Sequence, residues 1–193
     1  MSKRIALFSA AALGALALTA TAIAPAVAKD KMMKSEMSSD KTVMVGGAPM
    51  YPSKNIIENA VNSKDHTTLV AAVKAAGLVK TLEGKGPFTV FAPTNAAFGK
   101  LPPGTVETLV KPESKATLTK ILTYHVVPGR LEAASLTDGK KLKTVEGETL
   151  TVKNSGGQIM LVDAKGGMAH VTQADVMQSN GVIHVTDSVS LPG

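Results

Sequence analysis

Residues 88–98 read Phe-Thr-Val-Phe-Ala-Pro-Thr-Asn-Ala-Ala-Phe, and this stretch decides how the rest of the chain is interpreted. Its first five residues are a compact apolar run that is typical of a buried β-strand. Pro93 biases the residue before it away from helix, and Thr94 or Asn95 can accept a hydrogen bond from the first amides of a following helix. The stretch therefore predicts a strand that turns directly into a helix, with Thr94 and Asn95 as structural caps rather than ligand contacts.

Two further segments join apolar runs to turn residues in the same way. Residues 124–129 read Tyr-His-Val-Val-Pro-Gly, and residues 180–192 read Asn-Gly-Val-Ile-His-Val-Thr-Asp-Ser-Val-Ser-Leu-Pro. Asn180 and Gly181 predict a tight hairpin turn between two strands. Because side chains alternate along a strand, His184 should lie on the face opposite to its two neighbours. We expect it to be a structural residue of that face.

The pattern between these segments changes from helical to extended. Helical spacing is present at 54–62, 67–76, 105–110 and 112–123, with Asp65 as an expected N-cap and Gly77 as a helix stop. Tyr124 and His125 should begin a short strand directly after the last of these helices. Turn-bounded short strands are expected at 141–145, 148–153, 158–162, 169–172, 176–178 and 182–186. Helices first and antiparallel strands afterwards predict an α+β fold.

With the three segments in this order and spacing, residues 49–192 resemble a fasciclin-like domain. The resemblance implies a β-wedge or sandwich of mainly antiparallel strands flanked by several N-terminal helices. It also implies an adhesion or binding module without catalytic activity. In animal members, the Tyr-His region and an Asp-Ile pair are implicated in integrin contact. Carried onto this chain, that candidate binding surface is Leu122, Tyr124, His125, Val126, Asp175 and Val176, with Val in place of the family's Ile.

A structural role for the Tyr124–His125 pair is the competing interpretation. The chain has no Gly-x-Ser-x-Gly box and no His-Glu-x-x-His motif, and its 4 histidines are widely separated. Buried Tyr and His side chains usually have their polar atoms hydrogen-bonded. We therefore expect no catalytic residues, no cofactor and no metal site in this domain.

The N-terminus has the features of an export signal. Lys3 and Arg4 precede an apolar run over 5–23, and Ala26-Val-Ala28 forms a small-residue cleavage site. The alternative is a retained membrane anchor, because the run approaches the ~20 residues that span a bilayer. We expect a signal peptide at 1–28, a flexible leader at 29–48 and the fasciclin-like domain at 49–193. The protein should then be secreted, either to a periplasm or to the cell surface and its surroundings.

Methionines are frequent after the expected cleavage site. Thioether sulfur is a soft ligand that suits Cu(I), so a copper or small-ligand handling protein of the envelope is the alternative function. That site would use the leader together with His66. Its residues would be drawn from Met32, Met33, Met37, Met44 and Met50. The irregular spacing favours a solvated tether.

The amino-acid composition bears on the source of stability and on the classes of partner that we expect. The chain has no cysteine, so its stability must come from a packed core rather than from disulfides. Without residues 1–28 it holds 19 Lys and Arg against 15 Asp and Glu, which gives a formal charge of +4. This excess favours anionic surfaces but does not indicate nucleic acid. The expected partner is a cell-surface or matrix protein or a polysaccharide, and association with a membrane surface or with further copies is left open.

Overall fold

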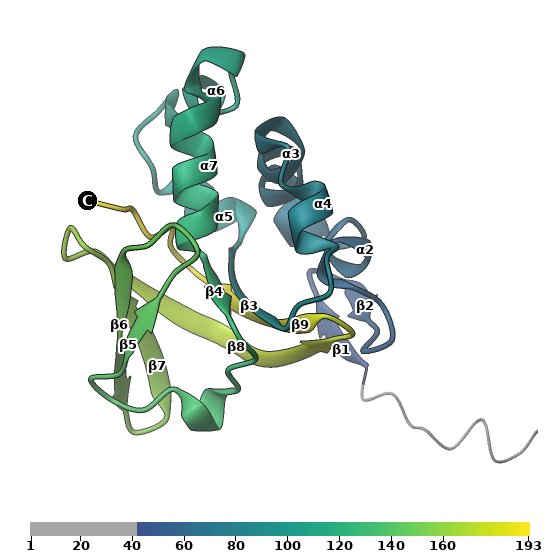
Figure 1. Ribbon diagram of the computed structural model, residues 1–193, viewed down its shortest axis with the longest axis vertical. Helices are drawn as coiled ribbons and strands as arrows, with labels where there is room; N and C mark the ends of the chain where they lie inside the picture. The colour runs from purple at the N-terminus through teal and green to yellow at the C-terminus, as the bar shows by residue number, and fades with distance from the viewer. Residues whose placement is uncertain (1–41) are drawn as a thin grey trace, which may run out of the picture. The chain divides into compact units, whose positions relative to one another are not determined.

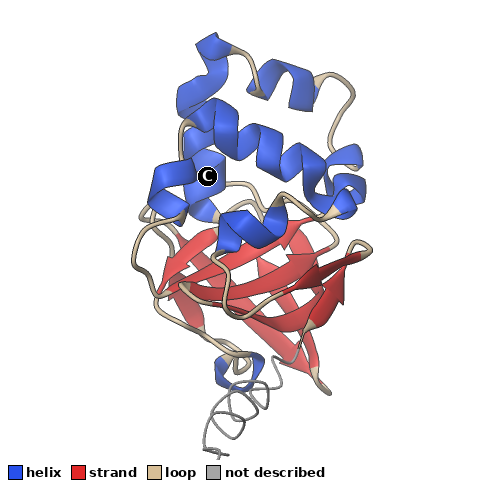
Figure 2. Cartoon of the chain, turned by 90° about the vertical axis from the view of Figure 1, so that its right-hand side faces the viewer, coloured by secondary structure: helices blue, strands red, loops and turns tan. Residues whose placement is uncertain are grey.

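The computed structural model describes residues 42–193. The helical elements are α2 (Ile56–Ala60), the 3-10 turn η1 (Lys64–His66), α3 (Thr67–Ala76), α4 (Val79–Leu82), α5 (Asn95–Gly99), α6 (Thr105–Leu109), η2 (Pro112–Ser114), α7 (Lys115–Tyr124) and η3 (Ala133–Ser135). Most of them lie together on one side of the strands (Figure 2).

The strands alternate with these helices at first and then follow one another. They are β1 (Val43–Val45), β2 (Ala48–Met50), β3 (Phe88–Pro93), β4 (Val126–Pro128), β5 (Lys141–Lys143), β6 (Thr149–Ser155), β7 (Gln158–Val162), β8 (Met168–Gln178) and β9 (Gly181–Thr186). Figure 1 shows β8 as the long strand that runs through the centre of the sheet. The α+β class and the mainly antiparallel sheet predicted from the sequence are confirmed.

Within residues 42–193, seven strands form one sheet in the order β4-β3-β9-β8-β7-β6-β5, and β1 and β2 form a separate hairpin. All neighbours are antiparallel except β3 and β9, which run parallel from Phe88↔Gly181 to Pro93↔Thr186. The two ends of the order approach each other, since the amide of Val145 donates to the carbonyl of Val126 at 2.8 Å. The sheet is therefore strongly curled.

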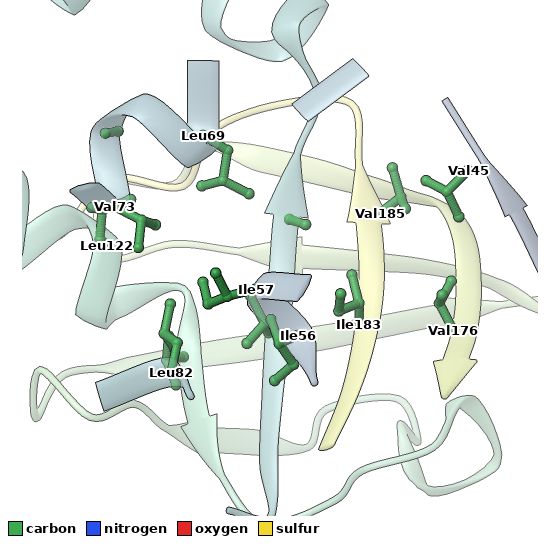
Figure 3. Packing of buried hydrophobic residues seen from close by; sticks show 14 of the residues in the cluster. Val45, Ile56, Ile57, Leu69, Val73, Leu82, Leu122, Val176, Ile183 and Val185 are labelled. Atoms are coloured by element: carbon green, nitrogen blue, oxygen red, sulfur yellow. The ribbon is translucent and has the colours of Figure 1, made fainter. Parts of the chain in front are cut away.

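Two hydrophobic clusters fill the space on either side of β3 and β9. One lies between the helices and these strands, where Ile56, Leu69 and Leu122 face Ile183 and Val185 (Figure 3). The other lies inside the curl of the sheet. Its buried members are Phe91, Tyr124, Val127, Leu136, Leu142, Leu150, Val152, Ile159, Leu161 and Ala169. Consecutive residues of one strand, such as Val90 and Phe91, therefore belong to different clusters.

Several boundaries expected from the sequence differ from those in the structure. Residues 43–48 were assigned to the leader, but Val45 and Ala48 are buried in the helix-side cluster, so the folded unit starts with the β1–β2 hairpin. Asp65 does not cap α3, whose N-cap position is His66 without a side-chain cap bond. Tyr124 is the last residue of α7 rather than the first of a strand. The predicted helix stop at Gly77 is confirmed, because Gly77 adopts the left-handed conformation at φ 75°.

Candidate interaction surface

The Tyr124–His125 pair lies at the junction of α7 and β4 with both side chains buried. Their rings meet edge to face, with centroids 6.4 Å apart. The Tyr124 hydroxyl accepts a hydrogen bond from the Ala164 amide at 3.0 Å and donates to the Thr149 carbonyl at 3.3 Å. Burial raises the pKa of Tyr124 above its usual 10.0. The pair fastens the end of α7 to the curled sheet.

His125 is held as a neutral ring in one tautomer. Its Nδ1 lies 2.8 Å from the Ile121 carbonyl, to which it donates, and its Nε2 accepts from the Ser190 amide at 3.0 Å. Only the form with the proton on Nδ1 satisfies both bonds. Burial lowers the pKa of His125 below 6.5, although the Ile121 carbonyl and Asp163 act in the opposite direction. A proton on Nε2 would point at an amide N–H, so this ring is unsuited to proton transfer.

Asp175 and His184 form a second node, where β8 bulges away from β9. Asp175 is at φ 57°, which is unusual for a residue with a side chain. Its Oδ1 accepts from the Ala133 amide at 2.7 Å, and its own amide donates to His184 Nδ1 at 3.3 Å. His184 Nε2 lies 2.7 Å from the Leu131 carbonyl, to which it donates, and the ring stacks on Phe91. Burial lowers the pKa of His184. These hydrogen bonds hold residues 131–133 against the bulge of β8.

The remaining motif residues cap helices and close turns. Thr94 caps its own helix by accepting from the Ala97 amide at 3.2 Å. Asn95 serves a different helix, since its Oδ1 accepts from the Thr68 amide of α3 at 3.0 Å. Asn180 Oδ1 accepts from the Ile56 amide that begins α2, at 3.0 Å. These residues tie the helices to each other and to the β8–β9 hairpin.

Gly181 is needed for close approach rather than for turn geometry. It pairs with Gln178, so the hairpin loop is Ser179 and Asn180, and none of these residues has a positive φ. A Cβ on Gly181 would lie 2.0 Å from the carbonyl oxygen of Phe88 on β3. The glycine lets β9 lie beside β3 at the point where their parallel pairing begins.

The candidate binding residues taken from the resemblance do not form one exposed patch. Leu122, Val126 and Val176 pack in the helix-side cluster, and Tyr124 packs inside the curl of the sheet. His125 is 3% exposed, and Asp175 is half-buried with its carboxylate engaged. The structure uses the six residues as internal supports in separate parts of the fold. A contact with a partner has to be sought elsewhere on the surface.

The outer side of strands β5 to β8 offers such a surface. The inward side chains of these strands fill the curl, so their alternate residues point outward. We call this outer surface the lysine face and define it as Lys141, Lys143, Thr149, Thr151, Lys153, Met160, Val162, Met168 and His170. None of these residues carries a carboxylate. Met168 is 55% exposed, which is unusual for a large apolar side chain.

Strand register arranges the cations of the lysine face in a cluster. Lys141 of β5 lies opposite Thr151 of β6. Lys153 is two residues beyond Thr151 on β6, so Lys141 and Lys153 are diagonal neighbours about 7 Å apart. Lys143 follows Lys141 on the same side of β5. Among the described residues, the salt bridges that form involve Lys100 and Lys120 and none of these three lysines. The sequence shows two of these lysines in Lys-Leu-Lys at 141–143. It does not show that Lys153 lies beside them, because that residue is on another strand.

A surface hollow lies at the β8–β9 turn. It has a volume of about 520 Å³, and Lys85, Arg130 and Glu83 are at its rim. Its polar groups are largely committed to the fold, because Asn180 Nδ2 donates to the carbonyls of Leu82 and Gly84 and Arg130 donates to a backbone carbonyl of β8. Charges of both signs border this hollow. It gives a weaker basis for recognition than the lysine face.

The alternative copper site loses two of its expected members. Met50 is 2% exposed and His66 is 3% exposed, and both belong to the interior of the folded unit. Within residues 42–193, no group of three or more His, Asp and Glu side chains could hold a metal ion. Met32, Met33 and Met37 lie outside the described residues, as does the expected signal peptide. No helix of the described part is long and apolar enough to cross a membrane.

Comparison with known proteins gives a consistent set of matches. The family model of the Fasciclin domain matches residues 64–192. Protein sll1483 of Synechocystis sp. is 49% identical over 177 residues, which cover 91% of this chain and 93% of that protein. Immunogenic protein MPB70 of Mycobacterium bovis is 38% identical over 138 residues, which cover 69% of this chain and 66% of that protein.

A solved structure has the same fold. It is a FAS1 domain pair from the insect cell adhesion molecule Fasciclin I, with a TM-score of 0.65 over 72% of this chain and 51% of that chain. The sequence identity is 18%, so this likeness concerns the fold alone.

Proposed function

Because the chain belongs to the fasciclin domain family, we propose that it is an exported binding module that attaches to a macromolecule of the cell surface or matrix and catalyses no reaction. The observation that carries the proposal is the lysine face, an exposed sheet surface with clustered cations and no carboxylate.

The side chains that could perform chemistry support binding rather than catalysis. Both ring nitrogens of His125 and of His184 are hydrogen-bonded, in each case to a backbone group. The Tyr124 hydroxyl is likewise engaged with two backbone groups. A general acid or base must reach a substrate proton, and these groups are buried and already paired. Their arrangement holds a rigid scaffold, which is what a binding surface requires.

The chemistry of the lysine face favours an acidic polysaccharide as the partner. Lysine ammonium groups act as compact point charges, and a cluster of them attracts a polymer that carries repeated carboxylates or sulfates. The neighbouring Thr149 and Thr151 hydroxyls can exchange hydrogen bonds with sugar hydroxyls. A repeating polymer also engages several copies of the module, which raises the overall affinity without new contacts. Acidic proteins and anionic lipid are the competing partners.

Export is part of the proposal. Lys3, Arg4, the apolar run over 5–23 and the Ala26-Val-Ala28 site support cleavage after residue 28. N-terminal sequencing of the protein recovered from the envelope and medium tests this directly. A mature chain that starts at Lys29 supports export, and recovery of the uncleaved chain from the cytoplasm contradicts it.

The binding test uses residues 29–193 on an array of acidic and neutral polysaccharides, acidic proteins and anionic vesicles. The test variant is Lys141→Glu/Lys143→Glu/Lys153→Glu. The matched control is Lys64→Glu/Lys80→Glu/Lys111→Glu, which makes the same charge change at exposed lysines elsewhere. We expect salt-sensitive binding to acidic polysaccharide that falls at least about tenfold in the test variant alone.

Two results would contradict this proposal. Equal losses in the two variants would show that net charge acts without a defined surface. Binding only to acidic proteins or vesicles would replace the polysaccharide by that partner. Circular dichroism and melting curves of both variants must match the parent before affinities are compared.

A further inference from the structure

Two methionines and a histidine lie together on the outer side of β7 and β8. Met160 of β7 is paired directly with His170 of β8, and the next outward pair along the two strands is Val162 with Met168. Met168 is two residues from His170 on β8, so both side chains leave the sheet on the same side. Met160 is therefore the direct cross-strand neighbour of His170 and the diagonal neighbour of Met168. The Cβ atoms of such neighbours are about 5–8 Å apart, a separation that long side chains can bridge.

The donor atoms of these three side chains are free to bind a ligand. Within residues 42–193, neither ring nitrogen of His170 has a hydrogen-bond partner, because the bonds between this residue and Asp187 use the backbone amide and carbonyl of His170. His170 and Met168 are exposed, and Met160 is half-buried. One pair of hydrogen-bonded strands thus presents two thioether sulfurs and one imidazole on a single surface.

This donor set suits a soft metal ion. Thioether sulfur is a ligand that selects Cu(I), and imidazole also suits copper. Hard cations such as Mg²⁺ and Ca²⁺ require oxygen ligands, chiefly carboxylates, and the lysine face contains no carboxylate. The residue types therefore favour copper in its reduced form over the hard divalent ions.

The neighbouring charge favours an ion with a single positive charge. Lys153 is paired with Met160 on the side of β7 away from His170, so its ammonium group lies near the three donors. The Coulomb repulsion between this lysine and a metal ion doubles when the ion carries two charges instead of one. Thioethers and imidazole bind metals as neutral groups, so they do not offset that repulsion. We propose that Met160, Met168 and His170 form a binding site for Cu(I).

This site differs from the copper site expected from the sequence. It lies within the folded domain, where the sequence predicted no metal site, and it uses neither Met50 nor His66. The sequence does not reveal it, because the pairing of β7 with β8 brings Met160 beside residues that follow it by eight and ten positions.

The test is a titration of residues 29–193 with Ag(I), a stable ion with the charge and softness of Cu(I), in chloride-free buffer. NMR follows the labelled methionine methyl groups and the His170 ring, so binding by methionines of the leader is measured separately. We expect Met160, Met168 and His170 to shift along one saturable curve. Cu(I) under anaerobic, reducing conditions should shift the same residues. Zn(II) should bind them at least about tenfold more weakly.

Three variants test the ligands and the neighbouring charge. Met168→Leu removes one sulfur with little change in volume and should weaken Ag(I) binding, observed at His170, at least about tenfold. Met44→Leu is the matched control, because Met44 is 58% exposed but lies on β1, and it should leave the affinity unchanged. Lys153→Gln removes the nearby charge and should tighten Ag(I) binding about twofold.

Several results would overturn the proposal. Shifts confined to methionines outside this site, or separate saturation curves for the three residues, would show that they do not bind one ion together. Equal Ag(I) affinity in the parent and in Met168→Leu would exclude that sulfur as a ligand, and Zn(II) binding as tight as Ag(I) would contradict the preference for a soft ion. None of these measurements involves a polysaccharide, so this site and the proposed function can fail independently.

Discussion

The amide of Ser190 donates a hydrogen bond to Nε2 of His125, 3.0 Å away and 65 positions earlier in the chain. This bond joins the C-terminal segment to the junction of α7 and β4. Two further amides of that segment bind carboxylates, since Leu191 donates to Asp163 at 2.9 Å and Gly193 donates to Glu148 at 2.8 Å. The last residues of the chain are thus held against the sheet by side chains from three separate segments.

Acid should destabilise the protein in the range where histidine titrates. Burial lowers the pKa values of His66, His125 and His184 below 6.5. As the pH falls below 6.5, these histidines therefore bind protons in the unfolded state before they bind them in the folded state. The free energy of unfolding is therefore highest above about pH 6.5 and falls as the pH drops below that value. Urea unfolding at pH 7.5, 6.5, 5.5 and 5.0 measures this slope.

The carboxylates act in a lower range. Hydrogen bonds and cations lower the pKa values of Glu148 and Asp187 below 4.5 and 3.8, so their contribution to stability is lost only at more acidic pH.

His125→Asn provides the control variant for the histidine prediction, because asparagine does not titrate. It should reduce the slope between pH 6.5 and 5. A stability that is constant from pH 7.5 to 5 would contradict the histidine assignment.

Tyr124→Phe should cost about 1–3 kcal/mol, because it leaves the Ala164 amide and the Thr149 carbonyl without their partner in a buried site. Tyr51→Phe is the matched control, since Tyr51 is 37% exposed, and its effect should be within about 0.5 kcal/mol. Denaturant unfolding of the two variants measures both values. Equal, small effects would show that the Tyr124 hydroxyl is not needed for stability.

The sequence predicted the elements better than the contacts between them. Local patterns at 67–76 and 158–162 gave α3 and β7 with their observed bounds, because helical spacing and alternation are local properties. The parallel pairing of β3 with β9 joins residues about ninety positions apart, and nothing local encodes it. For the same reason, the sequence left Thr94 and Asn95 as alternative caps of one helix, whereas in the structure Thr94 caps α5 and Asn95 caps α3.

The candidate site was harder to predict than the fold. The Tyr-His segment was noticed because histidine can do chemistry, and the Asp-Val segment because of the family resemblance. The structure uses the polar atoms of both segments to pair backbone groups. The lysine face comes from side chains on separate strands, so it exists only after the register is known.

Asn180→Ala should destabilise the protein by about 2–3 kcal/mol. The side chain caps the Ile56 amide and pairs the carbonyls of Leu82 and Gly84, and alanine leaves all three groups without these bonds. Asn62→Ala is a suitable control, because Asn62 makes one exposed bond within its own segment. Urea unfolding compares the two. A loss no greater than that of Asn62→Ala would contradict the role of Asn180 as a junction.

Gly181→Ala and Gly99→Ala form a matched pair that tests the close approach of β9 to β3. A Cβ at position 181 would lie 2.0 Å from the Phe88 carbonyl oxygen, and β3 and β9 would have to separate to accommodate it. We expect a loss of more than about 3 kcal/mol, which is severe for one methyl group. At Gly99 nothing lies within 4 Å, and alanine there should be neutral or stabilising by up to about 1 kcal/mol. Thermal and urea unfolding of both variants would reveal the difference, and a Gly181→Ala protein as stable as the parent would show that β9 can move away from Phe88 at little cost.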